Sequence, residues 1–276
     1  MLTNLAELWR YRELIQNLVV RDLRARYKNS VLGIAWSWVN PLLMMIVFTV
    51  VFNVLTGQVE GLPYYPMFIL SGILPWNFFS ASVTGAIGSI VGNGHLIKKV
   101  YFPREVLPVS IVLANMVNFL IALPVFFVLA LLFGLQLSPW LALLPVVLIT
   151  QVMFSIGIGL ILATLNVFYR DTQIIMEVIM LAWFFLTPIF WDVAILPDSK
   201  VIGGIVLPVQ RLVYILNPMA SIVNAYRDIL YRGGIYGASF QPAMDFLSRT
   251  IVTAFVCMLL GYAVFHRYSY TFGEEV

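Results

Sequence analysis

The chain has 276 residues, of which 61% are hydrophobic and only 11% are charged, and its formal net charge is +3. A soluble domain carries about a quarter charged residues, so this chain lacks the charge to cover a water-facing surface. The composition therefore excludes an ordinary soluble protein and indicates one membrane domain with little room for a second, soluble one. The single cysteine, Cys257, excludes an internal disulfide.

The first 30 residues predict an amphipathic helix rather than a signal peptide, because they lack a compact apolar core and a small-residue cleavage site. Such a helix lies in the membrane interface, with its basic side toward headgroups or a partner. A plain surface anchor and a docking element both fit this pattern. The apolar face holds Leu5, Leu8, Ile15, Leu18 and Val19, and the polar face holds Glu7, Arg10, Asn17, Arg21, Arg24 and Lys28.

Six apolar runs approach or exceed the roughly 20 residues that a membrane-crossing helix needs. Prolines and glycines interrupt several of them, at Asn40–Pro41 in the first run and at Gly72 and Pro75 in the second. Such breaks indicate packing around a pathway, although proline is also common in membrane helices generally. The runs are Val31–Leu55, Pro66–Val91, Val106–Phe133, Leu141–Phe168, Ile174–Trp191 and Phe246–Phe265.

Residues 192–245 form a different kind of segment between the fifth and sixth runs. Its two apolar stretches, Val201–Leu216 and Ser221–Leu230, are too short or too broken to cross a bilayer. Asn217–Pro218 predicts a helix start, with Asn as the N-cap and Pro at the first helical position, and Gly233–Gly234 predicts its end. We therefore expect two short helices that form a re-entrant hairpin near one membrane face.

The distribution of Lys and Arg predicts the orientation of the chain. Basic residues gather in the N-terminal region, in loop 92–105, at Arg170 and at Arg267, whereas loops 56–65 and 134–140 contain none. Both termini are therefore expected in the cytoplasm, and residues 192–245 outside.

Several kinds of chemistry are missing from the sequence. It contains no phosphate-binding G-x-x-x-x-G-K-[ST] loop, no H-E-x-x-H motif and no clustered His/Cys set. We therefore expect no ATPase site, metal site or cofactor in this chain, and no nucleic-acid partner. Ionisable residues are nearly absent from the runs, and the exception is Glu177, less than two turns into the fifth run. Its shallow position favours contact with water or pairing with a cytoplasmic base over a proton relay.

Aromatic residues near helix breaks and membrane edges suit two roles. They form an interfacial belt in many membrane proteins, and their faces also stack on the apolar faces of sugar rings. The candidates for a sugar pathway are Trp36, Trp38, Trp76, Phe79 and Trp191. Loop 92–105, GNGHLIKKVYFPRE, is likewise suited to wedge into a partner's groove or to serve as a solvated connector.

Motifs in order along the chain identify a family resemblance. RDLRARYKNSVLGIAWSWVNPL, beginning at Arg21, resembles the N-terminal signature of ABC-2 type permeases that export cell-surface polysaccharides. These permeases move lipid-linked O-antigen, capsular polysaccharide or wall teichoic acid. The later blocks of the family are similar to LSGILPWNFF from Leu70, LIKKVYFPREVLPV from Leu96, NVFYRD from Asn166, TPIFW from Thr187 and NPMASIVNAYRDIL from Asn217.

The resemblance implies an all-α transmembrane domain of the type V exporter class over residues 31–276, with six helices, the interface helix and an outer re-entrant hairpin. It implies a homodimer in the cytoplasmic (inner) membrane that pairs with two copies of a separate ATPase, which binds ATP and Mg. The substrate would be an undecaprenyl-linked polysaccharide.

The resemblance also assigns roles to three groups of residues. ATPase coupling falls on Asn93, His95, Leu96, Ile97, Lys98 and Lys99, and the substrate-entrance loop includes Ser30, Leu32 and Gly33. Arginine and lysine bind phosphate oxygens well, so the carrier's pyrophosphate is expected to meet Arg24, Arg26, Lys28 and Arg104.

Two other classes of protein remain as alternatives. A secondary transporter or channel would work without an ATPase. An integral membrane glycosyltransferase would need a carboxylate pair or metal site at a membrane face, and the sequence has no visible pair of this kind.

Overall fold

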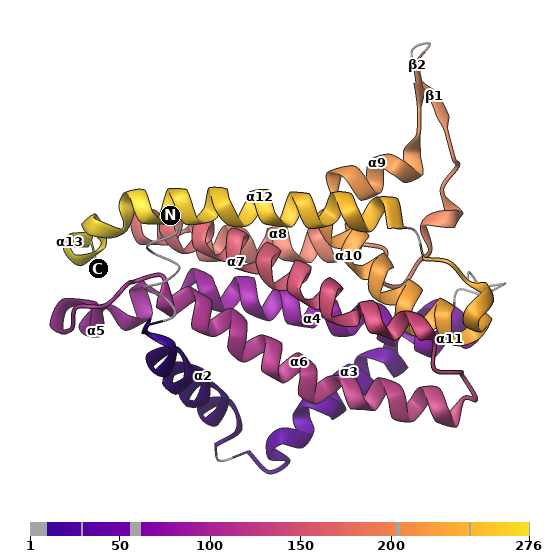
Figure 1. Cartoon of the computed structure of the whole chain (residues 1–276), viewed down its shortest axis with the longest axis horizontal. Coiled ribbons are helices and arrows are strands. Elements are labelled where there is room, and N and C mark those ends of the chain that lie inside the picture. Colours follow the sequence, from indigo (N-terminus) through magenta and orange to yellow (C-terminus); the bar gives the residue numbers. More distant parts are fainter. Residues whose placement is uncertain (1–9, 29, 56–61, 203–204, 243, 276) are drawn as a thin grey trace.

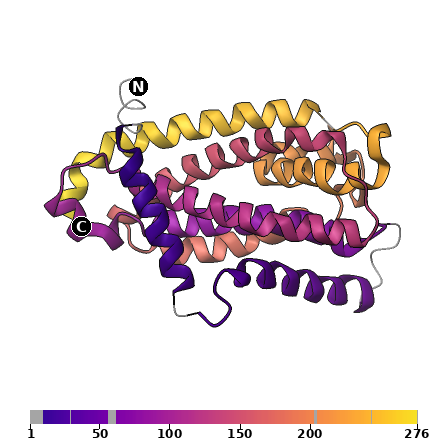
Figure 2. The ribbon, with the colours of Figure 1, turned by 60° about the horizontal axis from the view of Figure 1, so that its bottom comes forward.

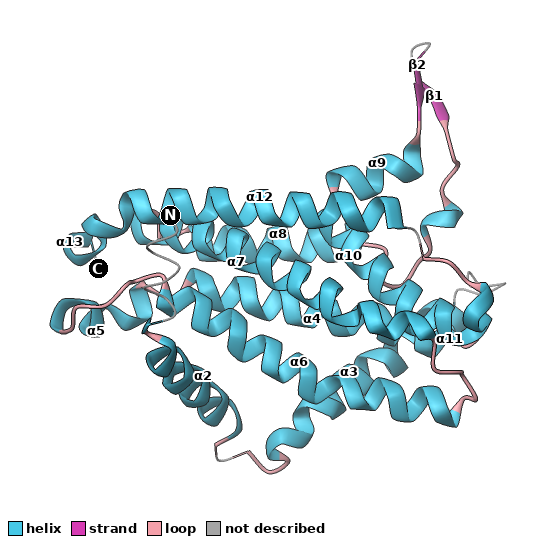
Figure 3. Ribbon diagram, in the orientation of Figure 1, coloured by secondary structure: helices cyan, strands magenta, loops and turns pink. Residues whose placement is uncertain are grey.

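The computed structural model describes residues 10–28, 30–55, 62–202, 205–242 and 244–275, and these form a bundle of long helices with one small hairpin (Figure 1, Figure 3). Within these ranges, five helices are long and apolar enough to cross a membrane: Gly33–Phe52, Tyr65–Ile87, Val106–Leu132, Pro139–Phe168 and Phe246–Glu275. They correspond to α3 (Trp36–Thr49), α4 (Tyr65–Ile87), α6 (Val106–Leu132), α7 (Leu144–Phe168) and α12 (Met244–Tyr268). Five of the six predicted spans are thus present at spanning length.

The remaining predicted span, Ile174–Trp191, is a shorter helix. It corresponds to α8 (Thr172–Leu186), whose 15 residues rise about 22 Å at 1.5 Å per residue. The helix stops because Pro188 disfavours helical geometry at Thr187, where ψ is 131°. The aromatic end of the run, Phe190 and Trp191, therefore lies beyond the helix.

The central helix of the bundle is α4, which contacts α3, α6, α7, α8 and α10 and buries most of its side chains. We expected breaks at Gly72 and Pro75, but α4 continues through both, and α3 continues through Pro41. These predictions were wrong because neighbouring segments cover the sensitive positions. Gln151 of α7 donates Nε2 to the carbonyl of Pro75 at 2.6 Å. Gly72 allows a close approach, since a Cβ there would lie 3.1 Å from Nη2 of Arg227.

The closest helix pair is formed by α7 and α12, at a pair of glycines. A Cβ added at Gly261 would lie 2.2 Å from the carbonyl oxygen of Gly157, and one at Gly157 would lie 2.6 Å from the backbone of Cys257. Small residues let membrane helices approach in this way and gain dispersion contacts along their length. The contact joins the fourth predicted span to the last.

One end of the bundle carries α2 (Arg12–Tyr27), α5 (Gly94–Lys99) and α13 (Phe272–Glu275), and we call it the α5 end. Figure 2 shows α2 lying crosswise to the long helices there. A buried apolar cluster joins these elements through Leu18, Ile97, Phe102, Phe265 and Phe272. Leu18 therefore packs on protein. Two residues of the predicted apolar face, Leu5 and Leu8, lie outside the described residues.

The opposite end holds α10 (Pro218–Arg227) and α11 (Gly233–Tyr236), and we call it the α10 end. The stretch Val201–Leu216 was expected to form one short helix, but it forms parts of a hairpin and then α9 (Val209–Leu216). In the hairpin, β1 (Lys200–Ile202) pairs antiparallel with β2 (Ile205–Leu207), with Lys200 opposite Leu207. Pro208 separates β2 from α9, so the apolar stretch is divided between two kinds of structure.

The helix start at Asn217–Pro218 is confirmed, because Asn217 accepts a hydrogen bond from the N–H of Ala220 and Pro218 opens α10. The end predicted at Gly233–Gly234 was wrong. The chain continues through a π-helical turn, Asp228–Arg232, into α11, and stops at Gly237, whose φ is +61°. Gly233 serves packing instead, because a Cβ there would lie 2.6 Å from Oγ of Ser138.

Candidate functional site

A polar cleft of about 700 Å³ lies where α2 ends and α3 begins, against α4 and α6. From our predicted site residues it contains Arg26 and Trp36, and Trp36 is 45% exposed. The rest of its wall mixes apolar side chains, such as Leu74, Phe78 and Phe119, with several polar ones. It includes Ser37, Asn40, Asn77, Ser80, Thr84 and Asn118.

Hydrogen bonds hold the α2–α3 corner against α6. The hydroxyls of Tyr27 and Ser37 lie 2.6 Å apart, Ser37 donates to Oδ1 of Asn118 at 2.7 Å, and Tyr27 also donates to that oxygen. Arg26 donates Nη1 to Oδ1 of Asn115 at 2.9 Å. Trp38, which is also exposed, donates Nε1 to the carbonyl of Ile121 at 2.7 Å. The corner beside the cleft is therefore held by specific polar contacts.

Other polar groups in the cleft have no hydrogen-bond partner within the described part of the chain. They are the side-chain amides of Asn40 and Asn77 and the hydroxyls of Ser80 and Thr84. Amides both donate and accept, and hydroxyls do the same. Such groups inside apolar helices suit a ligand rich in hydroxyls, or water, better than hydrocarbon.

The predicted aromatic residues are spread over three places. Trp36 and Trp38 stand at the start of α3. Trp76 and Phe79 are buried in α4, where ring centroids lie 5.5 Å apart between Trp76 and Phe184 and 5.0 Å apart between Phe79 and Trp183. Trp191 is half-buried after α8 and donates Nε1 to the carbonyl of Phe185 at 3.3 Å.

The four predicted phosphate-binding cations divide between two places. Arg26 lines the polar cleft, and Arg24 and Lys28 are exposed at the same end of α2. Arg104 instead lines a second groove of about 640 Å³, together with Arg10, just before the other end of α2. The 16 residues of α2 span about 24 Å, so one pyrophosphate cannot touch both groups.

The predicted entrance loop connects α2 to α3 beside the polar cleft. Leu32 is 44% exposed, and Gly33 has a φ of +51°, a left-handed conformation that glycine adopts without strain. Ser30 donates its backbone N–H to the carbonyl of Tyr27 at 3.3 Å, which closes the turn. The loop and Arg26 therefore lie at the same corner of the molecule.

Of the predicted coupling residues, Asn93 directly precedes α5 and the others lie in it, and the two sides of this helix differ in exposure. Ile97 is 8% exposed, inside the apolar cluster, and Leu96 is half-buried against it. His95, Lys98 and Lys99 are exposed. Asn93 donates Nδ2 to the carbonyl of Ser89 at 2.8 Å and accepts long bonds from Arg21 of α2, at 3.4 and 3.5 Å. A partner that docks on α5 would meet its polar side.

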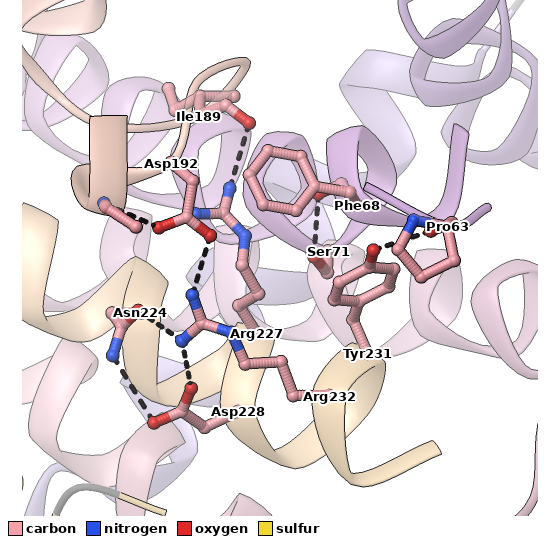
Figure 4. A network of polar contacts seen from close by, with 11 residues as sticks. Pro63, Phe68, Ser71, Ile189, Asp192, Asn224, Arg227, Asp228, Tyr231 and Arg232 are labelled. Atoms are coloured by element: carbon pink, nitrogen blue, oxygen red, sulfur yellow. Dashed lines mark hydrogen bonds and ion pairs between the residues drawn. The ribbon is translucent and has the colours of Figure 1, made fainter. Parts of the chain in front are cut away.

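A charge network at the α10 end was not predicted from the sequence (Figure 4). Arg232 forms ion pairs with Asp192 at 2.7 Å and with Asp228 at 2.6 Å, and it donates to Oδ1 of Asn224 at 3.0 Å. Asn224, Asp228 and Arg232 follow one another at i,i+4 spacing, which is a readable helix-face signal. Asp192, 40 residues earlier, was not predictable as their partner. We call these residues the Asp192–Arg232 network.

Arg227 lies beside this network and is buried (Figure 4). Its guanidinium stands 3.6 Å from the centroid of the Phe68 ring and donates Nη2 to the carbonyl of Ile189 at 2.9 Å. Burial lowers the pKa of Arg227 to about 10, although Asp192 opposes this shift. The arginine thus joins α10 to α4 and to the segment after α8.

The pKa of Asp192 is lowered from its usual value. Burial would raise it, but the N–H of Ala194 and the charges of Arg232 and Arg227 together outweigh burial. Among the described residues, no group of three or more His, Cys, Asp or Glu side chains could hold a metal ion. Glu177 is exposed on α8.

Two comparisons with known proteins, one with family models and one with individual proteins, identify the family of this chain. The ABC-2 type transporter family matches residues 13–231. The O-antigen export system permease protein RfbA of Myxococcus xanthus is 37% identical over 247 residues, which cover 89% of this chain and 90% of that protein. RfbA of Klebsiella pneumoniae is 31% identical and covers 95% and 94%. The polysialic acid transport protein KpsM of Escherichia coli is 23% identical and covers 89% and 91%.

Proposed function

Because this chain belongs to the ABC-2 type transporter family, we propose that it is the permease subunit of an ATP-driven exporter of a lipid-linked cell-surface polysaccharide. The observation that carries the proposal is the near full-length similarity to two proteins named as O-antigen export permeases. The more distant similarity to a polysialic acid transport protein supports the broader class of polysaccharide as the cargo. O-antigen is therefore the favoured substrate, ahead of capsule or teichoic acid.

The polar cleft supports a carbohydrate cargo. Its amide and hydroxyl groups can exchange hydrogen bonds with sugar hydroxyls, and Trp36 offers an exposed ring face at its edge. Arg24, Arg26 and Lys28 at the same corner are suited to the pyrophosphate of an undecaprenyl carrier. The carrier would then enter past Ser30, Leu32 and Gly33, beside the cleft.

The assembly we propose is a homodimer with two copies of a separate ATPase, which binds ATP and Mg. Exposed apolar residues on α3 and α8, such as Val47 at 56% and Val178 at 68%, suit contact with lipid or a second copy. The sequence has no phosphate-binding loop of its own. The exposed side of α5 supports docking of the ATPase at that end.

In the membrane we propose six crossings, with α8 as the fifth and both termini in the cytoplasm. An α8 of about 22 Å can cross with the segment after it, because Thr187, Pro188, Ile189 and Phe190 are buried against the bundle. Arg10, α5 and the C-terminal Ser269 and Tyr270 meet around one groove, which supports a common side for the two ends. Residues 192–245 would then cap the outer side as a re-entrant region.

A genetic and biochemical experiment tests this function. A strain without the permease should lose surface polysaccharide and accumulate the lipid-linked polymer inside, and the wild-type gene should restore export. A variant of the partner ATPase that cannot hydrolyse ATP should block the restoration. Export that continues with that variant but stops when the proton gradient collapses would indicate a secondary transporter. Turnover of a lipid-linked sugar donor by the purified chain would indicate a glycosyltransferase.

A further inference from the structure

The groove that contains Arg104 is strongly basic. It is bordered by Arg10 before α2 and Arg104 before α6, and along one edge by Lys98 and Lys99, which belong to the side of α5 proposed above to dock the ATPase. The acid on its wall is Glu105, whose Oε1 lies 3.3 Å from Nδ1 of His266. We call this cavity the basic groove. At about 640 Å³ it has the size of a small-ligand site.

Arg104 has a donor that the described residues leave unused. Its Nη1 is buried and has no hydrogen-bond partner among them. A buried donor without a partner is unfavourable, and a guanidinium fits the oxygens of a phosphate especially well. Nη1 itself is closed off from the groove, so the anionic ligand is indicated by the four cations that border the groove beside one carboxylate.

The place of the basic groove in the bundle indicates the source of that anion. Arg104 and Glu105 directly precede α6, and His266 lies two residues before the end of α12, so the groove lies where two predicted spans end. Its aromatic border includes Tyr11, Tyr101, Tyr262 and Tyr270. Tyrosines at a helix end are typical of headgroup depth, and basic pockets between helices on the cytoplasmic side bind anionic lipid headgroups.

The same geometry separates this groove from the expected path of the cargo. Arg26 and the entrance loop are at the far end of α2, about 24 Å away. We propose that the basic groove binds the phosphate headgroup of an anionic phospholipid of the inner leaflet, with Arg104 as the principal contact. The groove would hold a bound phospholipid and would not lie on the path of the exported polymer.

Native mass spectrometry of the purified full-length permease tests the proposal, with phosphatidylglycerol and phosphatidylcholine offered in equal amounts. The wild type should retain phosphatidylglycerol with a preference of about tenfold or more. Both lipids carry the phosphate, but phosphatidylcholine also carries a cationic choline, which the arginines and lysines of the groove repel. Arg104→Gln should bring the two lipids to near parity. Arg104→Lys, which keeps the charge but not the fork of donors, should fall between. Arg170→Gln, an exposed cation outside the groove at the α5 end, should keep the wild-type preference.

Other results would contradict the lipid-binding proposal. No lipid preference in the wild type, or an unchanged preference in Arg104→Gln, would overturn the proposal without reference to any variant's export. Displacement of phosphatidylglycerol by undecaprenyl diphosphate, one molecule for one, would assign the groove to the cargo's carrier. If Arg104→Gln keeps its lipid but loses the partner ATPase on purification, the groove is a protein-docking site. None of these outcomes is measured by an export assay. The lipid proposal can therefore fail while the proposed function stands.

Discussion

At the scale of single residues, Arg232 connects two segments that the sequence keeps 40 residues apart. Its guanidinium is shared between Asp192, after α8, and Asp228, in the helix that continues α10. Both carboxylates are largely buried, at 12% and 4% side-chain exposure. Removing one partner from such a set leaves polar groups without compensation in a poorly solvated place.

We therefore expect Asp192→Asn to lower the free energy of unfolding by about 1–3 kcal/mol, because Arg232 keeps Asp228 but loses its second carboxylate. Thermal unfolding of the purified permease in detergent measures the effect. Asp198→Asn is the matched control, since Asp198 is exposed and lies in the same segment. Equal melting temperatures for the two variants would show that the pair contributes nothing to stability.

The pH dependence of this effect has a defined sign. The pKa of Asp192 is lowered in the folded state, so its contribution is fully present above the unfolded value of about 4. It is lost as the pH falls through the lower, folded pKa. The difference in melting temperature between wild type and Asp192→Asn should therefore stay constant from about pH 8 to about pH 5 and narrow below about pH 4. A difference that is already lost at about pH 6 would contradict a lowered pKa.

At the scale of elements, the pairing of α7 with α12 depends on Gly157 and Gly261. A side chain at either position would meet backbone, which cannot move aside without separating the helices. We expect Gly261→Val to destabilise the permease by about 1–3 kcal/mol or more and to lower its yield in the membrane. Gly88→Ala is the control, because a Cβ at Gly88 would meet nothing within 4 Å. A normal yield and melting temperature for Gly261→Val would refute the close contact.

The helix α5 allows a test of coupling that separates its two sides. Ile97→Asp should lower the amount of folded permease, because it buries a charge among Leu18, Phe102 and Phe272. His95→Asp changes an exposed position and should leave that amount unchanged while it weakens binding of the ATPase and slows export. Co-purification of the ATPase, normalised to permease, measures the difference. If His95→Asp affects neither binding nor export, this side of α5 does not dock a partner.

At the scale of the whole molecule, the orientation in the membrane can be measured by cysteine labelling in a Cys257→Ser background. We expect a cysteine at Ser199 to react with an impermeant thiol reagent from outside, because Ser199 lies in the segment before the hairpin at the α10 end. Cysteines at Lys99 and Asp171, at the α5 end, should react only after the membrane is permeabilised. Labelling of position 99 in intact cells would reverse the orientation. Glu60, another expected outer position, lies outside the described residues.

Hydrophobic length and local chemistry are properties of the chain itself, and these were predictable. The apolar runs placed the long helices to within a few residues, and Asn217–Pro218 marked the start of α10 because an N-cap bond closes over three residues. The family resemblance likewise rested on short motifs in order. The predicted helix end at Gly233 was wrong. A glycine can serve either a turn or close packing, and at Gly233 the neighbouring Ser138 shows that it serves close packing.

The tertiary structure alone decided which distant residues meet. By sequence, Arg104 belonged with Arg26 as a phosphate-binding cation, but the length of α2 puts them in separate cavities. By sequence, Ile97 and His95 were equivalent members of the coupling loop, but in the structure Ile97 is buried and His95 is exposed. Asp192 forms an ion pair with Arg232 because α8 and α10 pack on the same central helix, α4. Contacts of this kind depend on the packing of whole helices, which residue type and spacing do not encode locally.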